Sequence, residues 1–402
     1  MRWLALVLLA GMAQAENLPD PVATTEVADP AQALADWSAE VRTRALAEGV
    51  SAATVDAALA GIEWLPAVVA ADRRQNEFTK TIWDYLDTAV SDDRIAAGQR
   101  ALAENADLLA DIEARYGVDR YVTTAIWGLE SAYGAVRGDI PTLSALATLA
   151  AEGRRGAFFT DQFVQALKIL DGGHVTPDHL TGSWAGAMGH TQFLPTSWAL
   201  WAQDWDGDGR RDIWSDDPAD ALASTAAFLA GNGWVTGQPW GVEVTLPEGF
   251  DYALARDTNR QPVAFWTGLG VRDTTGAPVP DHGAAVILLP GGADGAAFMI
   301  FRNFNVLEHY NTADAYVVAV GHLADRLRGG PPIAHDWPRQ ERALTLDERL
   351  ELQRLLTAAG FDTLGIDGRI GPRTVGAIRA WQRANGWRPD GFPSLSLLVA
   401  LR

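Results

Sequence analysis

The chain has no cysteine among its 402 residues. This absence excludes disulfide bonds, thiolate metal sites, a cysteine nucleophile and the lipid-bearing cysteine of a bacterial lipoprotein. Basic residues are also scarce, because 32 Lys and Arg stand against 51 Asp and Glu and leave a formal net charge of −19. So acidic a chain is a poor partner for nucleic acid or for an anionic membrane surface. The charge balance suits neutral or cation-bearing substrates instead.

A long hydrophobic run is missing as well, and the nearest approach to one lies at the N-terminus. Arg2 precedes an apolar run from Leu4 to Ala10, and Ala13-Gln14-Ala15 follows it. These are the charged, hydrophobic and small-residue parts of a secretory signal, so residues 1–15 are predicted to be a cleaved signal peptide. A retained membrane anchor is the alternative, but the run is too short to span a bilayer. With no lipid-anchoring cysteine, the sequence predicts a soluble protein of a bacterial periplasm.

Composition divides the rest of the chain into further parts. Residues 16–30 are rich in Pro, Asp, Thr and Ala and predict a flexible lead-in. Residues 31–328 carry mostly Ala- and Leu-rich amphipathic patterns, which predict a mainly α-helical domain, while the Pro/Gly-punctuated stretch 242–289 predicts a small β-containing lobe. Gly, Pro and polar residues in 329–343 indicate a linker, and residues 344–402 form a separate small unit.

The stretch Ile126 to Gly134 reads Ile-Trp-Gly-Leu-Glu-Ser-Ala-Tyr-Gly. Apolar residues recur at helical spacing and predict one buried helix over 119–133, with Gly134 as its left-handed terminator. Glu130 lies beside that stripe, near the negative end of the helix dipole, and both effects raise the pKa of its carboxyl group. A carboxylic acid kept neutral near pH 7 can donate a proton to a glycosidic oxygen. The alternative is an ordinary helix-surface glutamate.

The stretch 182–195 places three glycines and two alanines among large aromatics. Such a run indicates backbone packed close to a ligand or to another helix. A purely structural packing motif explains the pattern equally well.

Carboxylates on alternate positions followed by a glycine match the start of an EF-hand calcium loop: Asp204, Asp206, Asp208 and Gly209. The Arg210 carbonyl would be the next ligand, and Asp212 would act directly or through water. The twelfth position is Ser215 instead of Glu, so Asp220 or Asp217 would have to close the cage. The predicted cofactor is a structural Ca²⁺, and the alternative is a solvated acidic turn.

Together, these stretches resemble the lytic murein transglycosylases of the membrane-bound-lytic-transglycosylase-B type. Gly128 to Gly134 is similar to the catalytic motif of that family, Ser183 to Pro195 to its second motif, and 204–220 to its calcium loop. Asn303-Phe304-Asn305 with Tyr310 and Tyr316 fits its last active-site helix. The tail around Leu352-Gln353, Asp367-Gly368, Gly371-Pro372 and Trp381-Gln382 looks like a three-helix peptidoglycan-binding domain. The resemblance covers about residues 30–402.

The resemblance implies a mainly α, lysozyme-like catalytic domain with a small β-containing lobe and a small three-helix C-terminal domain. It also implies cleavage of the MurNAc–GlcNAc β-1,4 bond of peptidoglycan with formation of 1,6-anhydroMurNAc ends. Ser183 would then hydrogen-bond to the acetamido group. The other residues that would contact glycan, stem peptide or lactyl group are Met188, Gln192, Tyr310, Tyr316, Phe228, Arg154 and Arg155. Position 228 is Phe where the family often has Tyr, and position 190 is His where some members have Tyr.

The number of acidic residues in the motifs bears on the mechanism. Ordinary glycosidases need two carboxylates across the scissile bond, but the second motif offers none as a partner for Glu130. One acid/base is sufficient if the substrate acetamido group supplies the nucleophile, although Asp139 or Asp161 could come near in the fold. A hydrolytic muramidase and a non-catalytic peptidoglycan-binding scaffold are the alternatives. In each case the expected partners are peptidoglycan glycan strands.

Overall fold

The computed structural model describes residues 27–74, 80–255 and 259–402. The predicted signal peptide and most of the predicted lead-in lie outside the described residues. The described chain divides into two compact units. The first contains residues 27–74, 92–234 and 309–312, and the second contains the remaining described residues, 80–91, 235–255, 259–308 and 313–402.

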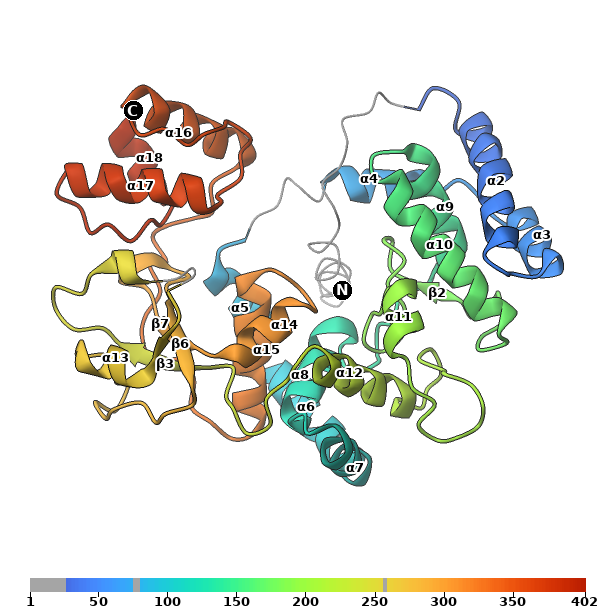
Figure 1. Ribbon diagram of the computed structural model, residues 1–402, viewed down its shortest axis with the longest axis horizontal. Coiled ribbons are helices and arrows are strands. Elements are labelled where there is room, and N and C mark those ends of the chain that lie inside the picture. Colours follow the sequence, from blue (N-terminus) through green and yellow to red (C-terminus); the bar gives the residue numbers. More distant parts are fainter. Residues whose placement is uncertain (1–26, 75–79, 256–258) are drawn as a thin grey trace. The chain divides into compact units, whose positions relative to one another are not determined.

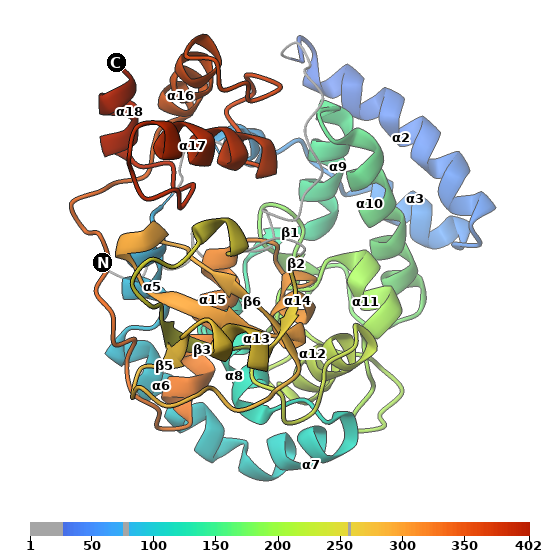
Figure 2. The ribbon, with the colours of Figure 1, turned by 60° about the vertical axis from the view of Figure 1, so that its left-hand side comes forward.

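The first unit is built mainly from helices (Figures 1 and 2). Their bounds are α2 Pro30–Ala47, α3 Ala52–Ala60, α4 Pro66–Arg74, α6 Asp92–Glu104, α7 Ala106–Tyr116, α8 Arg120–Ser131, α9 Thr142–Glu152, α10 Gly156–Asp171, α11 Pro195–Trp201 and α12 Ala219–Gly231. Both views show α9 and α10 packed side by side. Two short strands, β1 (Ile140–Pro141) and β2 (Thr181–Gly182), pair antiparallel and join the start of α9 to the second motif.

Helix α8 carries Glu130 and is buried along almost its whole length. The Asp119 side chain caps its N-terminus by accepting a hydrogen bond from Tyr121 N at 2.8 Å. The helix ends at Ser131, two residues before the predicted end. Ala132 and Tyr133 then take the left-handed φ values of 51° and 59°, ahead of Gly134 at 84°. Two consecutive non-glycine residues in this conformation store backbone strain directly after the end of the helix.

The second unit contains an antiparallel five-stranded sheet in the order β4-β6-β7-β3-β5. The strands are β3 Gly241–Thr245, β4 Gln261–Pro262, β5 Arg272–Asp273, β6 Ala284–Leu288 and β7 Ala297–Ile300. The other elements of this part are α5 Ile82–Ala89, α13 Val263–Gly268, α14 Arg302–Glu308, α15 Asp314–Leu327 and the short 3-10 segments η1 Tyr252–Leu254 and η2 Gly292–Asp294. An apolar core that includes Trp266, Met299 and Phe301 supports the sheet.

Three helices form the C-terminal domain: α16 Leu346–Ala358, α17 Pro372–Ala384 and α18 Leu395–Leu401. The capping box of Thr345 and Glu348 opens α16. The domain has its own core around Leu352, Ile378 and Leu397. The mainly helical fold, with a small β lobe and a small helical C-terminal domain, is confirmed. None of the described helices combines the length and the apolarity that a membrane crossing requires.

Candidate active site

Glu130 lies in the last turn of α8 and has 0% of its surface exposed. Tyr310 is its neighbour in the same unit. Burial raises the pKa of the Tyr310 phenol, and the charge of Glu130 acts in the same direction. The Tyr310 hydroxyl donates to the backbone oxygen of Thr191 at 2.6 Å. Glu130 is therefore removed from water and lies within electrostatic range of a neutral phenol.

Aromatic rings surround Tyr310. Phe228 lies edge-on to it at 5.1 Å between ring centroids, and Phe193 lies at 6.1 Å. Trp201 lies edge-on to Phe228 at 5.9 Å between ring centroids. Phe228 is thus buried within an aromatic cluster, and its predicted contact with sugar stays a prediction.

The second motif folds into a tight loop in which Met188 pairs through its backbone with both Gly182 and Phe193. Gly189 has φ +71°, and a Cβ there would lie 2.2 Å from the backbone oxygen of Ile213. The small residues of this motif are therefore required by backbone packing, whatever they also do toward a ligand. Met188 itself is fully buried.

Ser183 and Gln192 are both buried in this loop. The Ser183 hydroxyl accepts a hydrogen bond from Ala187 N at 3.1 Å, so its own proton remains available to donate to a ligand. The Gln192 amide nitrogen donates to the backbone oxygens of Arg137 and Gly189, at 2.9 Å each. Gln192 also has a left-handed φ of 55°, a strain that is typical of functional sites.

His190 connects the C-terminal end of α8 to the end of the acidic loop. Its Nδ1 accepts the indole N–H of Trp127 at 3.1 Å, and its Nε2 donates to the backbone oxygen of Ser215 at 2.7 Å. Arg137 donates to the same oxygen at 2.6 Å and pairs with Asp216 at 2.7 Å. Burial lowers the pKa of His190, so the imidazole is neutral in this network.

The backbone around His190 is tied to the same helix end. The Ser131 hydroxyl donates to the His190 backbone oxygen at 2.5 Å and accepts from Gly134 N at 2.9 Å. A Cβ at Gly134 would lie 2.5 Å from His190 Nδ1. The residues that follow Glu130 are therefore held against the imidazole ring.

Arg154 and Arg155 bind a buried carboxylate inside the protein. Asp72 is 2% exposed and forms ion pairs with both, at 3.0 Å to Arg154 and with a shorter contact to Arg155. Glu152 accepts the backbone N–H of Arg154 and pairs with Arg73 at 3.1 Å. Burial raises the pKa of Asp72, against the opposing influence of the two guanidinium groups. The arginine pair is thus part of an internal ionic cluster, and its contact with substrate stays a prediction.

Tyr316 belongs to α15 in the second unit, where its side chain is almost completely buried. This placement fits a core tyrosine, and a sugar contact for Tyr316 stays a prediction.

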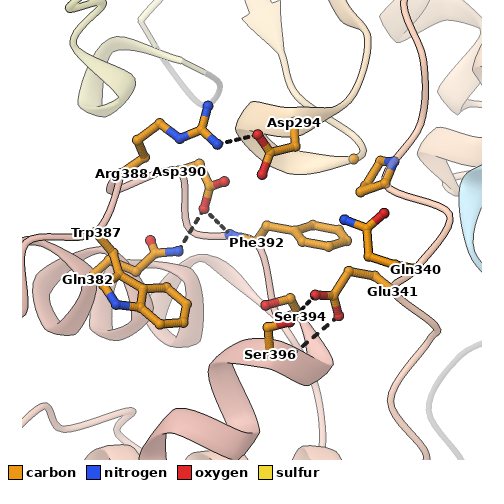
Figure 3. A pocket seen from close by; sticks show the side chains of 12 residues that line it. Asp294, Gln340, Glu341, Gln382, Trp387, Arg388, Asp390, Phe392, Ser394 and Ser396 are labelled. Carbon is orange, nitrogen blue, oxygen red and sulfur yellow. Dashed lines mark hydrogen bonds and ion pairs between the residues drawn. The ribbon is translucent and has the colours of Figure 1, made fainter.

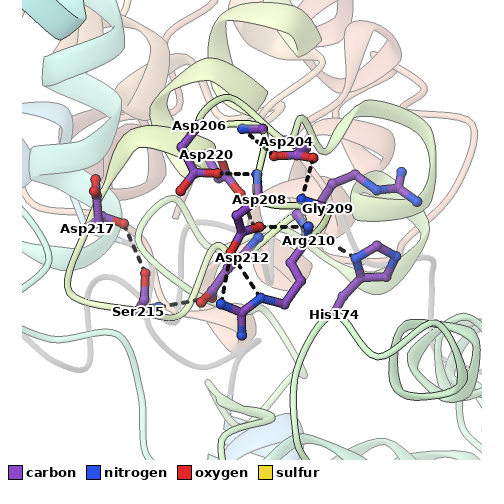
Figure 4. Close-up of polar contacts among 12 residues, drawn as sticks. His174, Asp204, Asp206, Asp208, Gly209, Arg210, Asp212, Ser215, Asp217 and Asp220 are labelled. Carbon is purple, nitrogen blue, oxygen red and sulfur yellow. Dashed lines mark hydrogen bonds and ion pairs between the residues drawn. The ribbon is translucent and has the colours of Figure 1, made fainter.

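The acidic loop brings three carboxylates together (Figure 4). Oxygens of Asp204, Asp206 and Asp208 all lie within 4.8 Å of one another on the surface. This set of hard oxygen donors fits Ca²⁺. The Arg210 side chain folds back onto Asp208, at 2.8 Å, and offsets part of the negative charge.

Neither of the two candidates for the closing ligand belongs to this group of three. Both Asp220 oxygens accept backbone N–H groups, from Trp205 and Asp212, at 2.7 Å each. Burial raises the pKa of Asp220 to about 6. Asp217 accepts the N–H of Ala219 at 3.0 Å at the start of α12. Asp220 therefore holds the backbone of the loop through these two hydrogen bonds, and its role as a metal ligand stays a prediction.

Several residues that shape the site were not singled out from the sequence. Arg94 is buried and donates to the backbone oxygen of Gly128, and its own backbone oxygen accepts from Tyr133 at 2.9 Å. Arg137 and Asp72 are the others. Their partners lie more than thirty residues away, so no local spacing marks them.

Comparison with known proteins agrees with this geometry. The family described as transglycosylase SLT domain matches residues 33–325, and a peptidoglycan binding domain matches residues 345–401. The chain therefore belongs to the transglycosylase SLT domain family. The resemblance carried by the motifs is confirmed, as is the lysozyme-like fold.

Three relatives are of particular interest. Membrane-bound lytic murein transglycosylase B of Escherichia coli (strain K12) is 32% identical over 215 residues, which are 52% of this chain and only 56% of that protein. SltB3 from Pseudomonas aeruginosa, solved in complex with NAG-NAM-pentapeptide and with NAG-anhNAM-pentapeptide, is 48% identical with a TM-score of 0.90 and covers 92% of this chain and 100% of its own. Escherichia coli SLT35, solved in complex with calcium, is 25% identical with a TM-score of 0.63 and covers 73% and 92%.

Proposed function

We propose that the protein is a periplasmic lytic transglycosylase that cleaves the MurNAc–GlcNAc β-1,4 bond of peptidoglycan and leaves 1,6-anhydroMurNAc ends. The observation that carries the proposal is the complete burial of Glu130 at the end of α8, beside Tyr310, in a chain of this family. The complex of SltB3 with NAG-anhNAM-pentapeptide supports the anhydro product.

Glu130 would act first as acid and then as base. Its carboxyl proton passes to the glycosidic oxygen as the bond from that oxygen to C1 breaks, and the acetamido oxygen of the same sugar bonds to C1. The Glu130 carboxylate then takes the proton of the C6 hydroxyl. The C6 oxygen bonds to C1 and displaces the acetamido oxygen, which closes the 1,6-anhydro ring. Ser183, whose hydroxyl proton is available, would hold the acetamido group for the first step.

The surroundings of two other acidic residues support a single acid/base. Asp161 forms an ion pair with Arg44 at 2.7 Å, and 53% of its side chain is exposed. Asp139 is exposed as well. Asp161 is therefore engaged in an ion pair of its own, and neither residue is among the groups whose charge acts on Tyr310 beside Glu130.

Substitution of Glu130 tests this mechanism. Glu130→Gln keeps the shape of the side chain and removes the transferable proton, so turnover of purified sacculi should fall by roughly three orders of magnitude or more. Glu104→Gln, on an exposed position of α6 in the same unit, is the matched control and should keep full activity. Full activity of Glu130→Gln would end the proposal. Mass spectrometry of the products separates the transglycosylase from a muramidase, because an anhydro end is one water lighter than a reducing end.

We further propose that Asp204, Asp206 and Asp208 hold a structural Ca²⁺. Their convergence supports the site, as does the calcium complex of SLT35. Calcium at one hundred times its Kd should stabilise the fold by about 3 kcal/mol. The thermal midpoint should therefore rise with calcium and fall with chelator, and Asp206→Asn should abolish the difference. An unchanged melting curve would remove the metal site.

The C-terminal domain is proposed to bind peptidoglycan strands, which its match to a peptidoglycan binding domain supports. Export through a cleaved signal peptide is tested by the mass of the secreted chain, which should begin at Glu16.

A further inference from the structure

Two hollows adjoin on the second unit, where the β lobe, residues 329–343 and the C-terminal domain meet. The first has a volume of about 340 Å³ and the second about 610 Å³, both within the range of ligand pockets. Trp387 and Arg388 line both hollows. We call the two together the composite groove.

The walls of the composite groove are fixed to one another. Asp390 of the C-terminal domain accepts the N–H of Ala293 in the β lobe at 2.8 Å. Arg388, which lines both hollows, forms an ion pair with Asp294, which lines the first (Figure 3). A Cβ at Gly292 would lie 2.8 Å from the Asp390 carboxylate, so the two surfaces are in close contact. The groove is therefore preformed, which lowers the entropic cost of binding.

Trp387 offers an aromatic surface to this groove. Its side chain is 39% exposed, and the buried Trp381 holds it in an edge-to-face arrangement at 5.4 Å between ring centroids. A large, rigid and half-exposed indole in a pocket is a common anchor for a ligand. The flat apolar face of a pyranose ring matches such a surface.

The polar groups of the first hollow disfavour an anionic ligand. Asp294, Glu341 and Asp390 line it against the single guanidinium of Arg388. Glu341 is held in place by the N–H of Leu395 at 2.8 Å. Three fixed carboxylates disfavour a ligand that brings further carboxylates, such as a free stem peptide, and accept hydrogen bonds from hydroxyl and amide N–H groups.

Gln340 adds a neutral donor and acceptor. Its side chain is exposed at the edge of the first hollow, and within the described part of the chain its amide makes no hydrogen bond. An amide of this kind pairs well with the acetamido group of an N-acetylated sugar.

We propose that the composite groove is a second glycan-binding site, apart from Glu130, that takes a neutral N-acetylhexosamine segment of a glycan strand with one sugar ring stacked on Trp387. The proposal rests on the proposed glycan substrate but not on the chemistry of Glu130. Because the β lobe supplies one wall, binding requires more of the chain than the C-terminal domain alone.

The test uses the full chain with Glu130→Gln, which binds glycan without cutting it. The protein is labelled with 5-fluorotryptophan, and the Trp387 resonance is identified by its loss in Trp387→Phe. Addition of chitotetraose, a neutral chain of N-acetylglucosamine, should shift this resonance. Trp387→Ala should weaken retention on sacculi by roughly tenfold, as expected for one lost aromatic contact. Asp294→Asn, a change in the β lobe, should weaken the chitotetraose response at Trp387.

The matched control is Val399→Ala, which alters another exposed apolar residue of the C-terminal domain away from the groove and should leave retention unchanged. The proposal is overturned if the Trp387 resonance does not shift on addition of chitotetraose, or if it shifts only with a free anionic stem peptide. Release of muropeptides by the unmodified chain is measured separately. Its absence would refute the proposed function, while a shifted Trp387 resonance would still support the groove.

Discussion

The bond between the Trp127 indole and the His190 imidazole should be energetically important for the end of α8. His190→Phe keeps an aromatic ring but removes the acceptor at Nδ1 and the donor at Nε2. The Ser215 backbone oxygen keeps a hydrogen bond from Arg137 at 2.6 Å, so this acceptor stays satisfied. The buried indole N–H of Trp127 has no comparable substitute, and an orphaned donor of this kind costs about 1–3 kcal/mol.

A double-mutant cycle isolates that cost. Trp127→Phe alone removes the donor and leaves a small cavity, and Trp127→Phe with His190→Phe removes donor and acceptor together. The free energy of unfolding lost in the double variant should therefore be smaller than the sum of the losses in the two single variants, by about 1–3 kcal/mol. Urea unfolding followed by circular dichroism measures the three variants. His179→Phe, at an exposed imidazole of the same unit, is the control and should be neutral.

The same variants also report on catalysis. If the imidazole holds the residues after Glu130 in place, His190→Phe should lower kcat on sacculi severalfold and leave KM nearly unchanged. The variant would still bind glycan, but its displaced acid would protonate the glycosidic oxygen poorly. If the unfolding free energies lost in the two single variants add up to the loss in the double variant within about 0.5 kcal/mol, the indole–imidazole bond contributes nothing. Full turnover in a destabilised His190→Phe variant would show that the bond stabilises the fold without positioning Glu130.

Three further predictions address pH, charge and packing. Burial lowers the pKa of His322 to about 4, below the unfolded value of 6.5. The contribution of the neutral imidazole to the free energy of unfolding is therefore fully present above pH 6.5 and falls by up to about 3 kcal/mol toward pH 4. In urea unfolding, His322→Gln should flatten this fall. Asp72→Asn should cost about 3 kcal/mol, because Arg155 loses its buried partner, and should leave KM unchanged; a raised KM at full stability would instead assign the arginine pair to substrate. Gly189→Ala should lower the thermal midpoint far more than Gly173→Ala, which shares a left-handed φ but has no atom within 4 Å of the new Cβ; equal losses would show that strain alone matters.

Local patterns predicted the helix that carries Glu130 well but not the place where it ends. The apolar spacing before Glu130 places the side chains of α8 in the core, as the structure confirms. The predicted terminator was Gly134, whereas the helix ends at Ser131. The Ser131 hydroxyl bonds to Gly134 N, and Tyr133 bonds to the Arg94 backbone. The second of these contacts joins residues 39 positions apart, which periodicity along a helix cannot indicate.

In the candidate site, too, the sequence predicted contacts between residues that are close in the chain but not contacts between distant ones. The spacing of Asp204, Asp206 and Asp208 is local, and the structure brings these carboxylates together. The resemblance assigned Arg154 and Arg155 to substrate because two adjacent cations match a family pair. Their carboxylate partner, Asp72, lies more than eighty residues earlier, so the sequence offered no sign that the pair is buried.

The segment 329–343 was predicted as a linker from its Gly and Pro residues, but side chains beyond Pro332 hold it to the second unit. The Glu243 carboxylate accepts the backbone N–H of His335 at 2.8 Å, Arg339 makes two bonds to Asp87 at 2.8 and 2.9 Å, and the Trp337 ring lies 6.1 Å from that of Trp83. A tether raises local concentration by sampling space, which a segment pinned in this way does not do. The C-terminal domain should therefore act from a fixed position. Deleting it would also remove contacts from the β lobe, so a loss of binding in a truncated chain would have two causes. Trp387→Ala removes the proposed stacking surface and leaves the bonds between the C-terminal domain and the β lobe in place.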